Sequence, residues 1–303
     1  MKYSLLSFFL PFTGYPYHGN SIACPVCAHE EHFEVSSFDR RFKRLSMVGC
    51  EHCGLVYVNP MPRDDELEVY YSKFYRFDYQ AATTTPKARH LRKRVREAEH
   101  RINAVEEILP HNARTLDFGC GSGEFVAGMA EKGHDSNGFE PGETYGRYSV
   151  NRLGDRVQIA GWQDVKYEGT FDLVTCFHVL EHLRDPVSAL RQMAAWAGSN
   201  GYVYVEIPDM GQTVGNKGIG GFHFGHLTNF NHYNLVLAAG LAGLTPKKIV
   251  SPTGIIFSTN GESDIELMAT KGRELSKSLY ADGLAVSNYW RYQASKLTGK
   301  RVR

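Results

Sequence analysis

The sequence has no long apolar run and almost no net charge, and each absence narrows the class of protein. No stretch of its 303 residues approaches the roughly 18 consecutive apolar residues that a membrane-spanning helix requires. The net charge of +1 gives no field that would attract nucleic acid or an anionic membrane. The apolar run at residues 5–10 is short and ends at Pro11, so it is a poor export signal. We therefore expect a cytoplasmic protein with no membrane partner, for which nucleic acid is an unfavoured partner.

Cysteine is also scarce, with six residues in the chain, yet four of them form two C-x-x-C pairs. Two such pairs can supply four thiolates to one tetrahedral metal ion, and zinc is the usual metal for four sulfurs. Two disulfides or a redox pair are the alternatives, and disulfides fit a cytosolic protein poorly. We therefore predict a structural zinc site in a small zinc-ribbon module, with the ligands Cys24, Cys27, Cys50 and Cys53.

The most informative stretch is residues 114–125, which read R-T-L-D-F-G-C-G-S-G-E-F. A short apolar run leads into glycines at alternate positions, and an amphipathic segment follows. Glycine allows positive φ and lets a ligand approach the backbone, and the N–H groups of the next helix then face that ligand. Asp117 stands just before the first glycine, and a second predicted strand ends at Glu140, where a carboxylate can accept ribose hydroxyls. The pattern predicts a strand, a tight turn and a helix that bind a cationic or hydroxyl-rich ligand.

Strand and helix patterns alternate through the rest of the chain, which predicts an α/β fold with a mostly parallel sheet covered on both faces. The predicted strands are residues 115–118, 136–139, 157–159, 171–176, 202–207, 246–250 and 264–269, with a turn-rich approach to the last one at 254–261. The predicted helices are residues 87–109, 124–132, 143–153, 186–196 and 235–241, with a further one around 287–297.

Three segments in order, the glycine turn, the acid Glu140 and residues 171–186, resemble motifs of the class I S-adenosylmethionine-dependent methyltransferases. The G-x-G-x-x-G fingerprint of nicotinamide-binding domains fits the glycine spacing less well. The resemblance covers about residues 89–271 and implies a Rossmann-like, seven-stranded sheet with S-adenosylmethionine as cofactor. It also implies the residues that bind the cofactor, which are Asp117, Gly119, Cys120, Gly121, Gly123, Glu140, Trp162, Asp164, Phe177 and His178.

The cysteine module is followed by C-G-L-V-Y-V-N-P-x-P, and this leader is similar to that of bacterial methyltransferases of sugar and secondary-metabolite pathways. The resemblance therefore implies a small-molecule acceptor, such as a sugar or a nucleotide-sugar or polysaccharide precursor. Between the module and the main domain lies an aromatic cluster that is either a hydrophobic seam or a lid over the ligand. Its members are Tyr70, Tyr71, Phe74, Tyr75, Phe77 and Tyr79.

Histidines follow two predicted strands, and histidine titrates in the range that suits a base for methyl transfer. His226 and His182 are the first candidates, with His178 beside them. The string F-H-F-G-H that ends at His226 resembles a segment of the sugar C-methyltransferases, but Gly225 stands where that family carries an acid. O-, N- and C-methylation therefore remain open. The glycine-rich segment 211–225 is a candidate lid.

Two other functions remain as alternatives. An RNA methyltransferase would use the zinc ribbon and the basic helix at 87–101 to dock RNA, although the net charge argues against this. A non-catalytic, cofactor-binding subunit is the other. For any of these functions we expect the same division of the chain into five segments. They are a leader at 1–20, the zinc ribbon at 21–62, an aromatic linker or lid at 63–86, the methyltransferase domain at 87–271 and a helical tail at 272–303.

Overall fold

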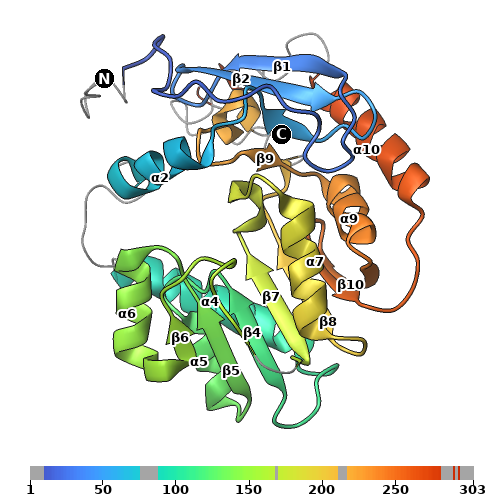
Figure 1. Ribbon diagram of the computed structural model, residues 1–303. Helices are drawn as coiled ribbons and strands as arrows, with labels where there is room; N and C mark the ends of the chain where they lie inside the picture. The colour runs from blue at the N-terminus through green and yellow to red at the C-terminus, as the bar shows by residue number, and fades with distance from the viewer. Residues whose placement is uncertain are drawn as a thin grey trace.

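The computed structural model describes residues 10–75, 88–167, 170–210 and 217–280, together with residues 289, 290 and 293 (Figure 1). Some predicted features lie outside these residues: Phe77 and Tyr79 of the aromatic cluster, Gly211 and Gly215 of the candidate lid, and most of the helix expected around 287–297. Among the helices that the structure describes, none has the length and apolar character needed to cross a membrane.

The main sheet has seven strands in the order β10-β11-β8-β7-β4-β5-β6, which confirms the predicted fold class. Strands β4 to β8 run parallel, whereas β11 is antiparallel to both β8 and β10. The strands are β4 (Arg114–Phe118), β5 (Asp135–Phe139), β6 (Val157–Gln158), β7 (Leu173–Phe177), β8 (Tyr202–Glu206), β10 (Thr245–Ser251) and β11 (Gly254–Ser258).

Helices pack on both faces of this sheet, and successive buried side chains of its central strands belong to opposite faces. Leu173 and Tyr204 belong to the cluster with Ile102 of α4, whereas Val174 and Val203 belong to the cluster that includes α7 and α9. The helices of this domain are α4 (Ala88–Val105), α5 (Glu124–Glu131), α6 (Glu143–Leu153), α7 (Pro186–Ala197), α9 (His232–Leu241) and α10 (Ile265–Tyr280), with 3-10 turns η1 (Gly154–Arg156), η2 (Leu180–His182) and η3 (Gly218–Gly221).

The end of the main domain differs from the prediction. Residues 254–261, expected as a turn, contain β11, and residues 264–269, expected as a strand, begin helix α10. The side chain of Asp264 accepts a hydrogen bond from the N–H of Leu267 at 2.9 Å, as helix-starting residues do. The buried residues of α10 then recur every three or four positions, at Ala269, Gly272, Ser276 and Tyr280, which is the helical period.

A second, antiparallel sheet carries the cysteine module and has the order β1-β2-β3-β9 (Figure 1). Its first three strands are β1 (His32–Phe38), β2 (Arg44–Cys50) and β3 (Val56–Val58), and α2 (Asp64–Lys73) follows them. The fourth, β9 (Thr228–Asn229), comes from the segment between β8 and α9 of the main domain. One sheet is therefore built from two segments that lie far apart in the sequence.

The turn that carries Cys53 packs on α9 and α10. A Cβ on Gly54 would lie 2.4 Å from the carbonyl oxygen of Gly272, so only glycine allows this approach. Asn234 donates a hydrogen bond from Nδ2 to the carbonyl of Cys53 at 2.5 Å, and Ser276 donates to the carbonyl of Gly54. These contacts hold the cysteine module against the main domain.

Asn234 is the residue of this contact that a substitution tests best. Asn234→Ala leaves the buried carbonyl of Cys53 without this donor and removes one half of the capping box with Asn231. We expect the free energy of unfolding to fall by about 1–3 kcal/mol. Urea denaturation followed by circular dichroism measures it, with Asn260→Ala at an exposed position as the control. Equal stability of the two variants would contradict this role.

Candidate active site

The glycine turn after β4 leaves room for a ligand. Gly119, Gly121 and Gly123 have φ of 74°, 56° and 80°, a region that side chains other than glycine rarely adopt. A Cβ on Gly121 would meet no heavy atom within 4 Å, whereas one on Gly119 would lie 2.6 Å from Val179. The turn therefore exposes backbone at Gly121, which lines a cavity.

Glu140 lies at the end of β5 beside this turn. Its two carboxylate oxygens accept hydrogen bonds from the N–H groups of Gly121 at 3.1 Å and Gly142 at 2.7 Å. Burial raises the pKa of Glu140 to about 7, although these two backbone hydrogen bonds act in the opposite direction. Each oxygen keeps a lone pair with which it can accept a ligand hydroxyl.

Asp117 is the buried acid at the end of β4. It accepts a hydrogen bond from the Thr175 hydroxyl at 2.7 Å. Burial raises the pKa of Asp117 to about 6, and the Thr175 hydrogen bond and the charge of Arg101 limit the rise. Two carboxyl groups with raised pKa values thus stand on either side of the glycine turn, and such perturbed groups are typical of functional sites.

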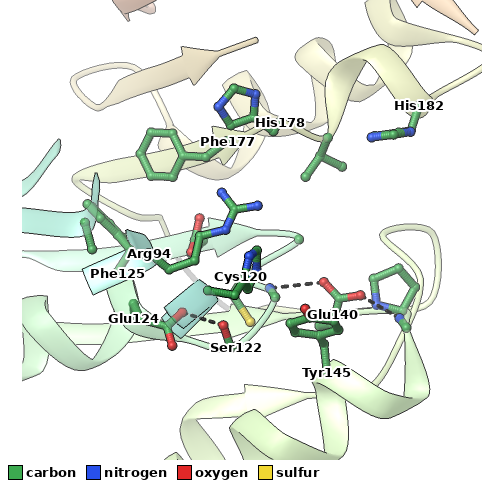
Figure 2. Close-up of a pocket in the computed structure, with 18 of the residues that line it drawn as sticks. Arg94, Cys120, Ser122, Glu124, Phe125, Glu140, Tyr145, Phe177, His178 and His182 are labelled. Atoms are coloured by element: carbon green, nitrogen blue, oxygen red, sulfur yellow. Dashed lines mark hydrogen bonds between the residues drawn. The ribbon is translucent and has the colours of Figure 1, made fainter. Parts of the chain in front are cut away.

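The cavity above these residues measures about 670 Å³, a size typical of small-molecule sites (Figure 2). Glu140 and Cys120 lie on one side of it and His178 and His182 on the other. The predicted site residues that line it are Asp117, Gly119, Cys120, Gly121, Glu140, Phe177, His178 and His182. Burial raises the pKa of the Cys120 thiol well above its usual value, which disfavours the reactive thiolate.

Four predicted residues are not among those that line the cavity. Gly123 is the N-cap of α5, and Trp162 packs against the core, with its ring 6.2 Å from that of Phe118. Asp164 is exposed, and His226 lies behind His182, 4.9 Å away between ring centroids.

The cavity also contains residues that the sequence motifs did not reveal. His90, Arg94, Ala98 and Arg101 line it from α4, at the spacing of one helical face. The run of basic residues in this helix is noticeable in the sequence, but only its register against the sheet decides which of them face the ligand. Tyr145 of α6 is a further lining residue with no signal in the sequence.

The aromatic cluster divides between the two roles that the sequence left open. Tyr70 and Phe74 are buried, and the Tyr70 ring packs 4.8 Å from Phe224, so this pair belongs to the seam with the main domain. Tyr71 and Tyr75 line the cavity instead. Tyr75 also contacts His182 edge to face, with 6.4 Å between ring centroids.

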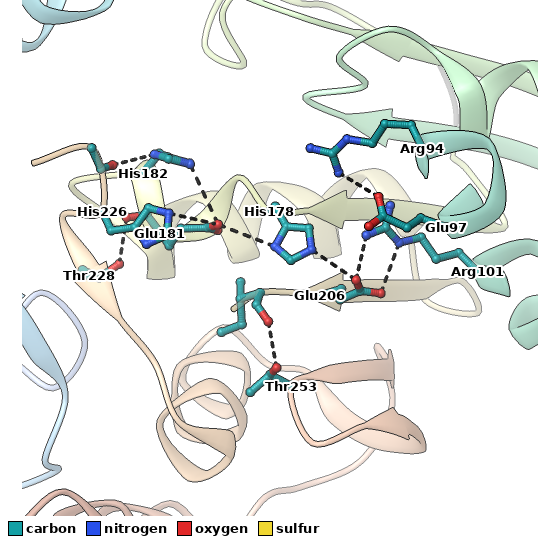
Figure 3. Close-up of polar contacts among 12 residues, drawn as sticks. Arg94, Glu97, Arg101, His178, Glu181, His182, Glu206, His226, Thr228 and Thr253 are labelled. Carbon is teal, nitrogen blue, oxygen red and sulfur yellow. Dashed lines mark hydrogen bonds and ion pairs between the residues drawn. The ribbon is translucent and has the colours of Figure 1, made fainter. Parts of the chain in front are cut away.

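His178 is oriented by two charged residues (Figure 3). Its Nε2 lies 3.2 Å from Oε1 of Glu206, and Arg101 binds the same carboxylate through two contacts of 3.1 and 2.7 Å. Burial alone would raise the pKa of Glu206, but His178 and Arg101 outweigh it and hold the pKa well below its usual range. His178 also has a φ of 58°, a strained conformation that is found at functional sites.

Glu181, on η2, is surrounded by histidines (Figure 3). Its Oε1 lies 3.8 Å from Nδ1 of His178, 3.8 Å from Nε2 of His182 and 3.9 Å from Nε2 of His226. The structure therefore brings together all three histidines that the sequence proposed, around an acid that it did not single out. Ligand atoms of Glu181, His182 and His226 lie within 4.8 Å of one another and could hold a metal ion.

The four cysteines of the two C-x-x-C pairs also converge. The sulfurs of Cys24 and Cys53 are 3.7 Å apart, and those of Cys27 and Cys50 are 3.5 Å apart. A disulfide requires about 2.05 Å, whereas sulfurs around a tetrahedral zinc lie about 3.8 Å apart, given Zn–S bonds of about 2.3 Å. The four sulfurs could thus hold one metal ion.

Comparison with known proteins identifies the family. A family model described as a methyltransferase domain matches residues 88–245, more than half of the chain. The ubiquinone biosynthesis O-methyltransferase of Marinobacter nauticus is 31% identical over 115 residues, which are 35% of this chain and 48% of that protein. The protein of the same name from Aliivibrio fischeri is 34% identical over 98 residues, 30% of this chain and 42% of that one. The chain thus spans less than half the length of these curated relatives.

Among solved structures, the amino pentose methyltransferase CalS10 of Micromonospora echinaspora has 19% identity and a TM-score of 0.45. The match covers 58% of this chain and 98% of that one. The family model and the seven-stranded sheet, with its antiparallel final strand, agree with each other. The chain therefore belongs to the class I S-adenosylmethionine-dependent methyltransferases.

Proposed function

We propose that this protein transfers the methyl group of S-adenosylmethionine to a hydroxyl group of a small molecule, with a sugar or a related metabolite as the acceptor. One observation carries the proposal. A single cavity has two acids and a glycine turn on one side and an oriented histidine on the other. The first side suits a cationic nucleoside, and the second suits removal of a proton from an acceptor.

The residues of the glycine side fit the cofactor. Glu140 would accept hydrogen bonds from the ribose hydroxyls, because each of its oxygens is already fixed by one backbone N–H and keeps a free lone pair. The open space at Gly121 admits the ligand against the backbone, and the Asp117 carboxylate would attract the positive charge of the methionine part. When bound, the cofactor supplies an electrophilic methyl group on a sulfonium whose departing thioether is neutral.

His178 is our candidate for the base. A base must reach the cavity, and His178 and His182 line it whereas His226 lies behind. Glu206 holds Nε2 of His178, so the nitrogen that would accept the acceptor's proton is Nδ1, which lies 3.8 Å from Oε1 of Glu181. A base held by a carboxylate that is itself fixed, here by Arg101, is a common catalytic arrangement. His182 and His226 would then act on the acceptor side without taking the proton.

Two observations favour a hydroxyl acceptor. The curated relatives bear the name O-methyltransferase. Gly225 replaces the acid that the sugar C-methyltransferases carry before the equivalent of His226. Arg94 also lines the cavity and would suit an acceptor with a negative group, such as a nucleotide-linked sugar.

We also propose that the four cysteines bind one structural zinc ion and that residues 21–62 form the module around it. The spacing of the sulfurs supports this, as does the N–H of Cys53, which points to Sγ of Cys50 at 3.5 Å. Zinc bonded in this way contributes directly to folding. Because β3 of this module pairs with β9, the ion would stabilise the segment that carries His226.

A screen with isotope-labelled cofactor tests the function. We expect a labelled methyl group on an oxygen of a nucleotide sugar, a free sugar or a related hydroxylated metabolite, located by mass spectrometry. Phenols and amino sugars serve as competing acceptor classes. A protein that shows no calorimetric binding of S-adenosylmethionine or of its demethylated product would overturn the proposal.

Cofactor affinity should depend on pH through Glu140. The ionised carboxylate accepts the ribose hydroxyls, and burial raises its pKa to about 7, so affinity should weaken as pH falls below 7. Protonation of this one carboxylate weakens binding by about tenfold in Kd per pH unit. Protonation of Asp117 should make the dependence of Kd on pH steeper below about pH 6. Calorimetry between pH 8 and 5.5 measures this. Glu140→Gln should bind weakly with a flatter profile, and the exposed control Glu143→Gln should match the wild type. A flat wild-type profile would refute this role of Glu140.

Loss of the proposed base should slow turnover without loss of cofactor binding. Asparagine tolerates positive φ, so His178→Asn should keep the strained backbone in place. We expect kcat to fall by about 10²–10⁴-fold, with the Kd for S-adenosylmethionine within about threefold of the wild type. His232→Asn, at the start of α9, is the matched control and should retain full activity. If kcat of His178→Asn stays within tenfold, another residue is the base.

A further inference from the structure

We propose that Glu181, His182 and His226 bind a divalent transition-metal ion in the wall of the cavity, separate from the four-cysteine site. The site is assigned from its own geometry. Its role in the reaction, described below, rests on the proposed function.

The buried carboxylate of Glu181 needs a cation. Its side chain is only 3% exposed. Neither of its oxygens accepts a hydrogen bond from any residue that the structure describes. A buried carboxylate without such bonds is costly unless a cation balances it. The imidazole nitrogens of His178, His182 and His226 lie 3.8–3.9 Å from its Oε1, which is too far for hydrogen bonds.

The hydrogen bond of His182 to Gly225 directs its other ring nitrogen at Glu181. Its Nδ1 lies 2.5 Å from the carbonyl oxygen of Gly225, and a carbonyl can only accept, so Nδ1 carries a proton. In the neutral ring Nε2 then has a lone pair, and this atom faces the Glu181 carboxylate at 3.8 Å. Metal ligands typically have this arrangement, in which two electron-pair donors face each other in a buried site.

The distances agree with a metal centre. Zinc-type bonds of about 2.0–2.2 Å to nitrogen and oxygen place two ligands up to about 4 Å apart, and the contacts of Glu181 with His182 and His226 are 3.8 and 3.9 Å. Two imidazoles and one carboxylate form a donor set for first-row transition metals that leaves coordination positions open. The hydrogen bond from His182 to Gly225 is the kind of contact that orients a metal-binding histidine.

The chain holds these three ligands in place from two distant segments. Glu181 and His182 are adjacent in η2, and His226 immediately precedes the segment that pairs with β3. Val58 donates its N–H to the carbonyl of Leu227 at 2.9 Å, and Thr228 donates its hydroxyl to the carbonyl of Glu181 at 3.4 Å. These hydrogen bonds therefore hold the two segments that carry the ligands next to each other.

An ion here would act on the acceptor. His182 lines the cavity, so an open coordination position on this side could bind an acceptor oxygen. A hydroxyl bound to the ion would have a lowered pKa. Its proton would pass to Nδ1 of His178 as its oxygen bonds to the methyl group. The electron pair of the broken bond between sulfur and the methyl carbon would stay on sulfur. This favours acceptors that chelate, such as vicinal diols or hydroxy-carbonyl compounds.

Metal content tests the site without any measurement of activity. Full-length protein is equilibrated with Zn²⁺, desalted and analysed by mass spectrometry for metal per chain, and Mn²⁺ is titrated separately with electron paramagnetic resonance. We expect two zinc ions per chain in the wild type, and one in both Glu181→Gln and His182→Asn. Mn²⁺ should bind to the wild type at one site and at least tenfold more weakly to both variants. His182→Asn keeps an N–H for Gly225, and His232→Asn is the control that should match the wild type.

The outcomes separate the two proposals. One zinc ion per wild-type chain with no bound Mn²⁺ would overturn the second site and indicate a histidine–glutamate ion pair instead. Metal binding by folded variants at the wild-type level would also overturn it. If the second metal binds while S-adenosylmethionine does not, the metal site stands and the proposed function fails.

Discussion

The short antiparallel pairing of β3 with β9 joins the cysteine module to the segment that carries His226. Only Val56–Asn229 and Tyr57–Thr228 are paired, yet they attach the segment after β8 to the cysteine module. That segment carries His226 and the carbonyl of Gly225, which contacts His182. The histidine side of the cavity thus lies beside a small sheet that the cysteine module and the main domain share.

The two sides of the cavity have different physical origins. The glycine side is built within about 25 residues, from the end of β4, the turn and the end of β5, and its contacts are mostly backbone hydrogen bonds to Glu140. The histidine side draws on α4, η2, β8 and the segment before β9. The glycine side thus depends on residues that are close together in the sequence, whereas the histidine side depends on segments that are far apart.

Much of the fold could be predicted from the sequence because parallel strands and covering helices have distinct patterns. The prediction was wrong at residues 254–269, where a fully buried strand has no alternation and the helix that follows starts with a capping aspartate. Asp117, Gly121 and Glu140, which the sequence predicted for the cofactor, lie at or just after the ends of β4 and β5, and all three line the cavity. Trp162 and Asp164 were assigned by resemblance, and neither is among the residues that line the cavity.

The sequence by itself determined the strand, turn and helix of the glycine side, and it predicted that the two C-x-x-C pairs form one group. Both features depend on short spacings along the chain. Only the tertiary structure decided which histidines face the cavity, which tyrosines form the seam, and that Glu181 stands among three imidazoles. Several of those relations join distant residues, such as Glu181 with His226. They depend on how η2, β9 and the cysteine module pack together, and local sequence patterns do not encode that packing.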